Sequence, residues 1–111
     1  VHNGISENHE ARRTELKSLG DRFTSETDTE CIAHRIHHHL KTHPKLFDAV
    51  RATVAELEGA YALAVMSQAN PDVIVLARCG CPVVVGHTPD GNYVASDVSA
   101  LLPVTREFMF L

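Results

Sequence analysis

The chain has 111 residues, of which 44% are hydrophobic and 22% charged, and its formal net charge at pH 7 is −4. Its ten lysines and arginines are spread along the chain, so there is no basic patch to bind nucleic acid or an anionic membrane surface. Apolar runs such as AYALAVM and FMFL fall short of the ~20 residues that a membrane-spanning helix needs. We therefore expect at most one globular domain, soluble and cytoplasmic, with no nucleic-acid and no membrane partner.

The N-terminal residues predict short elements. Residues 1–5 are typical of the end of a strand. The pair Asn3-Gly4 is either a tight turn or a site that presents a side-chain amide and a backbone N–H to a developing negative charge. Asn8 is a suitable N-cap for a helix that runs to about Leu19 and stops at Gly20. Residues 22–24 then predict a short extended segment.

Two amphipathic helices are predicted next. Residues 27–30, TDTE, form a capping box, in which the Thr27 hydroxyl and the Glu30 carboxylate each accept from the other residue's backbone N–H. The helix that follows has an apolar face made of Ile32, Ile36 and Leu40. Pro44 separates it from a second helix. The apolar stripe of that helix consists of Leu46, Val50, Val54 and Leu57, with Phe47 beside it.

After Gly59 the pattern changes to short, dense apolar runs, which predict strands. These runs are AYALAVM, VIVLA, VVV, YVA and FMFL, with turn signals at residues 70–72, 80–82 and 89–92. Helices that precede an antiparallel meander indicate an α+β fold, with the helices packed on one face of the antiparallel sheet.

The segment HRIHHHLKTH contains five of the eight histidines. His34 and His38 are one helical turn apart, a spacing that suits two metal ligands, and Cys31 precedes them by one turn. However, His34, His37 and His38, the last two within the run His37-His38-His39, lie on the side opposite the apolar stripe. No acidic or histidine partner at a recognisable spacing completes a metal site. The pattern favours a solvated helix face whose charge changes with pH, and we expect no metal site.

The three cysteines do not form the even-numbered pattern of a secreted disulfide framework. Cys79 and Cys81 are separated by one residue rather than by the two of the usual redox motif, and no second pair completes a zinc site. We expect free thiols and no cofactor.

The run HNGISENHEARRTELKSLGDRFTSETDTECIAH closely resembles the glutaminase domain of the class II, N-terminal-nucleophile glutamine amidotransferases. The resemblance continues in order through ELEGAYALAVM, LARCGCPVVVG and ASDVSALLPVTREFMFL. The forms HNGxxEN, SETDTE and ALLPVTR favour the glutamine–fructose-6-phosphate aminotransferases (glucosamine-6-phosphate synthases) within this class. Amidophosphoribosyltransferases share HNG and an SDTE-like element, and are the alternative.

This resemblance implies part of a four-layer α-β-β-α sandwich, with residues 1–111 as a partial glutaminase domain truncated at both ends. In the family the nucleophile is a cysteine at the mature N-terminus, whose own α-amino group activates its thiol. None of the three cysteines begins this chain, so we expect no nucleophile in it and no activity of residues 1–111 alone.

The resemblance also assigns site residues. Asn3 matches the family residue whose side-chain amide helps to form the oxyanion hole, and Gly4 matches the one that gives a backbone N–H. Asp28 matches the carboxylate that holds the α-ammonium of glutamine. Cys79, Cys81 and the triple histidine depart from the family pattern, and we interpret them as local variation.

For the parent enzyme, the resemblance implies transfer of the glutamine amide nitrogen to fructose 6-phosphate, which gives glucosamine 6-phosphate and glutamate. Downstream sugar-phosphate isomerase domains and a homodimer are implied as well. Two other hypotheses remain open: a different acceptor, as in phosphoribosylamine synthesis, and a non-catalytic binding module with a metal-responsive, histidine-rich helix.

Overall fold

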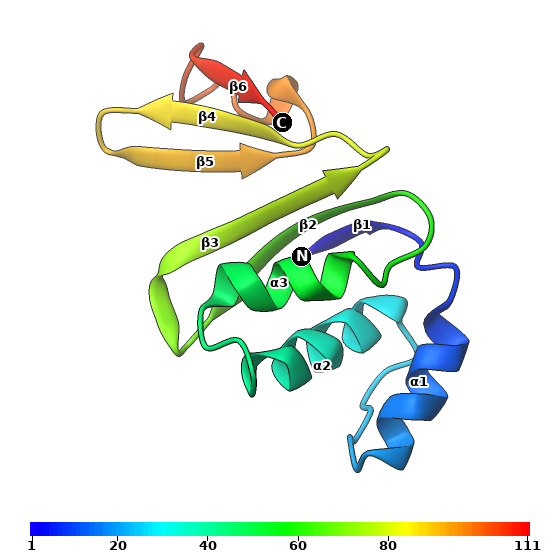
Figure 1. The fold of residues 1–111 in the computed structure, drawn as a ribbon. Coiled ribbons are helices and arrows are strands. Elements are labelled where there is room, and N and C mark those ends of the chain that lie inside the picture. Colours follow the sequence, from blue (N-terminus) through cyan, green and yellow to red (C-terminus); the bar gives the residue numbers. More distant parts are fainter.

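The computed structural model describes all 111 residues, which form three helices and six strands (Figure 1). The helices are α1 (His9–Ser18), α2 (Asp28–Leu40) and α3 (Leu46–Val54). The strands are β1 (His2–Gly4), β2 (Tyr61–Ser67), β3 (Asn70–Cys79), β4 (Val84–Thr88), β5 (Gly91–Ala95) and β6 (Phe108–Phe110), with a short 3-10 helix η1 (Val98–Ala100). No helix is both long and apolar enough to cross a bilayer.

The strands form two antiparallel sheets, with the orders β1-β2-β3 and β5-β4-β6. The single meander that we expected is therefore wrong in its topology. β1 pairs with β2 although all three helices lie between them in the sequence, with Asn3 opposite Ala62. β6 pairs with β4, with Met109 opposite Val85. Alternating apolar residues mark a strand but not its neighbour, so the pattern could not show these two long-range pairings.

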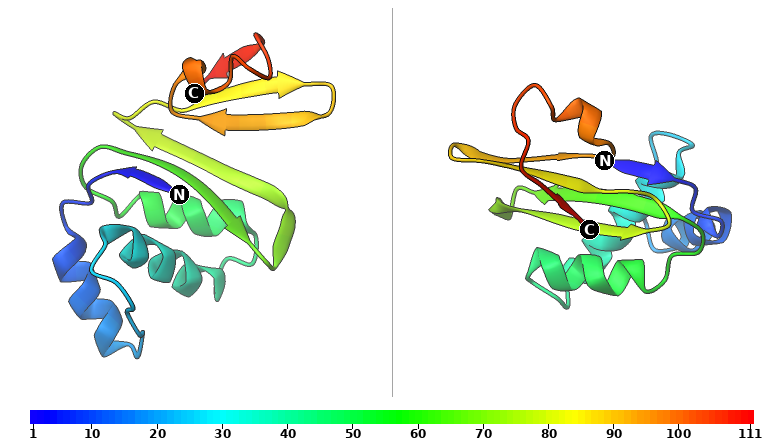
Figure 2. Two further views of the ribbon diagram at one scale, coloured as in Figure 1. Left: turned by 180° about the vertical axis from the view of Figure 1, so that it is seen from behind. Right: turned by 90° about the horizontal axis from the view of Figure 1, so that it is seen from above.

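The elements stack in three layers (Figures 1 and 2). Helices α2 and α3 cover one face of the first sheet, and the second sheet lies on the other side of it. The segment between β3 and β4 carries the chain from one sheet to the other. The predicted α+β fold with helices on one face of an antiparallel sheet is confirmed for the first sheet.

The core lies between the helices and the first sheet. It consists of Ile32, Ile36, Leu46, Ala49, Val50, Leu63 and Val75. The predicted stripes thus supply the core, while Leu40, Val54 and Leu57 pack partly buried at its edge. Phe47 points away from it and is 60% exposed.

Residues 22–24, predicted as a short extended segment, lie in the loop between α1 and α2. Two other local predictions need correction. The β2–β3 turn lies at residues 68–69 instead of 70–72, because Pro71 sits near the start of β3, an edge strand that tolerates a missing N–H. In the capping box, the Thr27 hydroxyl does accept from the Glu30 N–H at 3.4 Å, but the Glu30 carboxylate does not return to Thr27. It accepts from the backbone of Thr24 and Ser25 instead, at 2.9 and 2.8 Å, because this loop folds around it.

Replacing Leu46 by Ala should lower the free energy of unfolding by about 2 to 5 kcal/mol, because the side chain is 2% exposed within the core. Phe47→Ala, the neighbouring change on an exposed side chain, should cost no more than about 0.5 kcal/mol. Urea denaturation of both variants measures the difference. Equal losses would show that α3 does not face the sheet as described.

Candidate functional site

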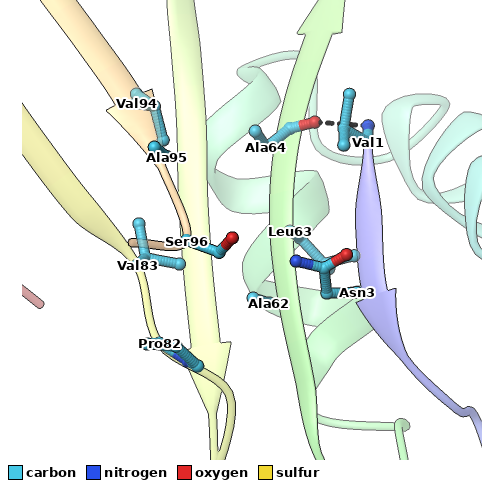
Figure 3. Close-up of a pocket in the computed structure, with 10 residues that line it drawn as sticks. All are labelled: Val1, Asn3, Ala62, Leu63, Ala64, Pro82, Val83, Val94, Ala95 and Ser96. Carbon is cyan, nitrogen blue, oxygen red and sulfur yellow. Dashed lines mark hydrogen bonds between the residues drawn. The ribbon is translucent and has the colours of Figure 1, made fainter. Parts of the chain in front are cut away.

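Asn3 lines a cavity of about 220 Å³ between the two sheets (Figure 3). On the side of the first sheet its lining includes Val1, just before β1, and Ala62, Leu63 and Ala64 of β2. On the side of the second sheet the lining residues belong to β5 or lie next to β4 and β5, and they are Pro82, Val83, Val94, Ala95 and Ser96. The Asn3 side chain points across the cavity toward the segment that carries Ser96, and no hydrogen bond joins its amide to the other lining residues. An unengaged amide in a mostly apolar cavity is able to donate to an oxygen that gains negative charge there.

Gly4 has a structural reason to be glycine. Its φ is +105°, and a Cβ atom at this position would lie 2.2 Å from the carbonyl oxygen of Ala60. A side chain is excluded both by the backbone conformation and by this close approach. Gly4 is not among the residues that line the cavity.

Asp28 is the first residue of α2, and its carboxylate is held by the chain that follows β1. The backbone N–H of Ser6 donates to Oδ2 at 2.7 Å. Oδ1 lies 3.9 Å from the Nδ1 atom of His2, and the side chain is 19% exposed. The structure thus connects Asp28 to the strand that carries Asn3 and Gly4, although Asp28 does not itself line the cavity.

His2 completes the junction between β1 and α2, although it was not among the predicted site residues. Its Nδ1 atom lies 2.9 Å from the Thr29 hydroxyl, while its Nε2 atom is buried with no hydrogen-bond partner. Alternation along β1 places His2 and Asn3 on opposite faces of the sheet. That alternation was a signal in the sequence that His2 faces the helices.

The loop that leads into Asp28 is fixed from two sides. The Arg13 guanidinium donates to the carbonyl oxygens of Ser25 and Thr27 at 2.8 and 2.9 Å and stacks over Phe23, with 4.6 Å to the ring centroid. Hydrogen bonds from the Ser25 hydroxyl and from loop N–H groups lower the pKa of Glu30 from 4.5 to about 2, although desolvation acts in the opposite direction. The first turn of α2 is therefore anchored to α1.

The histidine face differs from the solvated surface that we expected. His38 Nε2 lies 2.6 Å from Asp21, His34 Nε2 lies 3.1 Å from Glu30, and both imidazoles are half-buried, whereas His37 is exposed. Asp21 comes from the loop before α2, so helical spacing did not reveal it. These contacts are ion pairs when the imidazoles are protonated, and no group of three or more potential ligands is arranged to hold a metal ion.

All three cysteines are free. Cys31 is buried beside the carbonyl oxygen of His9, and this burial raises the pKa of its thiol. Cys79 is exposed and Cys81 half-buried, and neither lines the cavity beside Asn3. The cavity therefore presents an amide donor but no thiol of this chain.

Comparisons with known proteins give the same family throughout. Residues 1–103 match the glutamine amidotransferase domain. Glutamine–fructose-6-phosphate aminotransferases [isomerizing] of Acidithiobacillus ferridurans and Xanthomonas campestris are 55% and 57% identical to the whole chain, which spans 18% of their length. In fold, 91% of the chain matches the glutamine phosphoribosylpyrophosphate amidotransferase from B. subtilis solved with ADP and GMP, with a TM-score of 0.78 and 29% identity. The match covers 22% of that structure's chain.

Replacing Glu30 by Gln should reduce the acid sensitivity of folding. Because the folded-state pKa of Glu30 is lowered, its contribution to stability is present above pH 4.5 and is lost as the pH falls toward 2. The free energy of unfolding, measured across this range, should fall less steeply for Glu30→Gln than for the unchanged chain. Glu26→Gln, an exposed change in the same loop, is the control, and an identical slope for both variants would contradict the assignment.

Proposed function

The chain belongs to the glutamine amidotransferase domain family, and from this premise we propose that it supplies part of a glutamine-hydrolysing site. The proposal rests on the Asn3 amide, which lines the cavity between the sheets without a hydrogen bond to another lining residue. Two residues beyond the end of the same strand, the backbone N–H of Ser6 donates to the Asp28 carboxylate. One group suits a developing oxyanion and the other a cationic amine.

In the proposed reaction, a thiolate attacks the side-chain amide carbon of glutamine, and the carbonyl oxygen becomes an oxyanion. The Asn3 amide and the Gly4 backbone N–H donate hydrogen bonds to this oxygen. Collapse of the intermediate breaks the C–N bond, releases ammonia after protonation of the nitrogen, and leaves a glutamyl thioester. Water then hydrolyses the thioester to glutamate and regenerates the thiol.

The nucleophile in this proposal is a cysteine that precedes residues 1–111 in a longer protein. Two findings support this: no cysteine of the chain lines the cavity, and the chain spans 18% of the length of its aminotransferase relatives. Residues 1–111 are then a partial glutaminase domain, and they should release no glutamate from glutamine when expressed alone.

Asp28 is the proposed partner of the glutamine α-ammonium. The backbone N–H of Ser6 donates to Oδ2, whereas Oδ1 lies 3.9 Å from Nδ1 of His2, beyond hydrogen-bond distance. Oδ1 is therefore free to accept from an ammonium, and the Ser6 hydrogen bond keeps the carboxylate oriented.

We propose fructose 6-phosphate as the acceptor of the ammonia, with glucosamine 6-phosphate and glutamate as products. The identity of 50–57% to glutamine–fructose-6-phosphate aminotransferases supports this choice over a phosphoribosyl acceptor, since the phosphoribosylpyrophosphate amidotransferase is 29% identical. Sugar-phosphate isomerase domains, a homodimeric assembly and a cytoplasmic location belong to the same proposal.

In the full-length protein, Asn3→Ala should lower kcat for glutamine hydrolysis roughly 100- to 1000-fold, because a donor to the oxyanion is removed. The KM for glutamine should stay within about twofold, since the oxyanion exists only in the transition state. Glutamate release measures both constants. Asn92→Ala, an exposed change in β5, is the control, and an Asn3 variant as active as this control would remove Asn3 from the site.

Asp28→Asn should raise the KM for glutamine roughly 30-fold, equivalent to about 2 kcal/mol for the loss of one charge-assisted hydrogen bond. Asp48→Asn makes the matched change in the first turn of α3, where the side chain is exposed, and should leave the KM unchanged. If the two variants had the same KM, Asp28 would not hold the substrate.

A further inference from the structure

The buried imidazole of His2 is a feature that the proposed reaction does not use. Its side chain is 2% exposed and lies between β1 and the first turn of α2. Nδ1 contacts the Thr29 hydroxyl at 2.9 Å, but Nε2 is buried without any partner. A buried polar atom without a hydrogen bond destabilises the folded state, so an apolar residue would serve simple packing better.

We propose that His2 is a positioning residue that sets the place of the Asn3 amide relative to the Asp28 carboxylate. The inference rests on the proposed function. His2 directly precedes Asn3, and Thr29 directly follows Asp28, so their hydrogen bond joins the two neighbours of the proposed site residues. A shift of α2 against β1 cannot occur without breaking it.

A second hydrogen bond joins the chain just beyond the C-terminal end of β1 to the same helix. Ser6 N–H donates to Asp28 Oδ2 at 2.7 Å, two residues beyond Gly4. The two bonds therefore bracket Asn3-Gly4 and fix both ends of this segment to the same helical turn. The Ser6 bond orients the carboxylate, and the His2 bond sets the separation of strand and helix.

The surroundings also favour one tautomer of His2. The negatively charged Asp28 Oδ1 lies on the Nδ1 side, at 3.9 Å, which favours a proton on Nδ1 that is donated to the Thr29 hydroxyl. Nε2 then carries a lone pair and is buried without a partner. This arrangement avoids an unpaired N–H, the rarer and less favourable kind of buried polar group.

A positioning role predicts a specific kinetic effect. If Asp28 holds the glutamine ammonium, substrate still binds when the His2–Thr29 bond is lost, but the reacting carbonyl is displaced from the Asn3 amide. Misalignment of this kind lowers kcat, whereas the KM changes little.

Thr29→Val is the sharpest test, because it removes the hydroxyl and keeps the shape of the side chain. In the full-length protein we expect kcat for glutamine hydrolysis to fall at least 10-fold, with KM within about twofold. Thr29→Ser, which restores the hydroxyl, should recover kcat to within about threefold. Each variant is assayed well below its own thermal midpoint, so that loss of folded protein does not mimic loss of alignment.

Substitutions of His2 provide a second, independent test of the same hydrogen bond. His2→Asn places an amide nitrogen near the position of Nδ1 and should retain more activity than His2→Gln, whose amide reaches toward the position of Nε2. The double variant His2→Gln, Thr29→Val should be no slower than the worse single variant, because both remove the same bond.

Three results would overturn the inference. Thr29→Val with an unchanged kcat, an equal loss for Thr29→Ser, or additive losses in the double variant would each show that the His2–Thr29 bond does not align the site. An unchanged full-length protein that releases no glutamate from glutamine would refute the proposed function itself, and the positioning role with it. If the unchanged protein does release glutamate, a negative result with the variants refutes the positioning role and leaves the proposed function intact.

Discussion

The hydrogen bond from the Ser6 N–H to the Asp28 carboxylate, 2.7 Å long, is the contact on which the candidate site depends. It joins the first turn of α2 to the chain just after β1, although Ser6 and Asp28 are 22 positions apart in the sequence and the whole of α1 lies between them. The His2–Thr29 hydrogen bond joins the first residue of β1 to the same turn of α2. Together the two hydrogen bonds join the strand that carries Asn3 to the helix that begins at Asp28.

The rest of the fold holds this junction in place. β1 is only three residues long, so its position is set by pairing with β2 and by the glycine that lets its end approach Ala60. α2 is held by its apolar face on the first sheet, while Arg13 and Glu30 fix the loop before it. The second sheet then forms the other wall of the cavity that Asn3 lines. Core packing, strand pairing and loop hydrogen bonds thus all help to position the Asn3 amide and the Asp28 carboxylate.

Elements with strong periodicity could be predicted from the sequence. The apolar faces of α2 and α3 were expected to be buried, and they are, because each amphipathic helix packs its apolar face against the core. The buried residues on these faces include Ile32, Ile36, Leu46 and Val50. The split into two sheets and the pairing of β1 with β2 could not be predicted, since they depend on contacts between distant segments. Asn3, Gly4 and Asp28 are proposed as site residues on a family resemblance, since their local patterns also fit ordinary turns and helix starts. Asp21 beside His38 and Thr29 beside His2 emerge only when loop and strand are brought against α2.

The most direct test of the central claim is a crystal structure of the full-length protein with glutamine bound. It should show the side-chain carbonyl oxygen of glutamine about 3 Å from the Asn3 amide nitrogen, and the α-ammonium in contact with the Asp28 carboxylate. A glutamine bound with its side chain away from Asn3, or with its ammonium held by another carboxylate, would contradict the account.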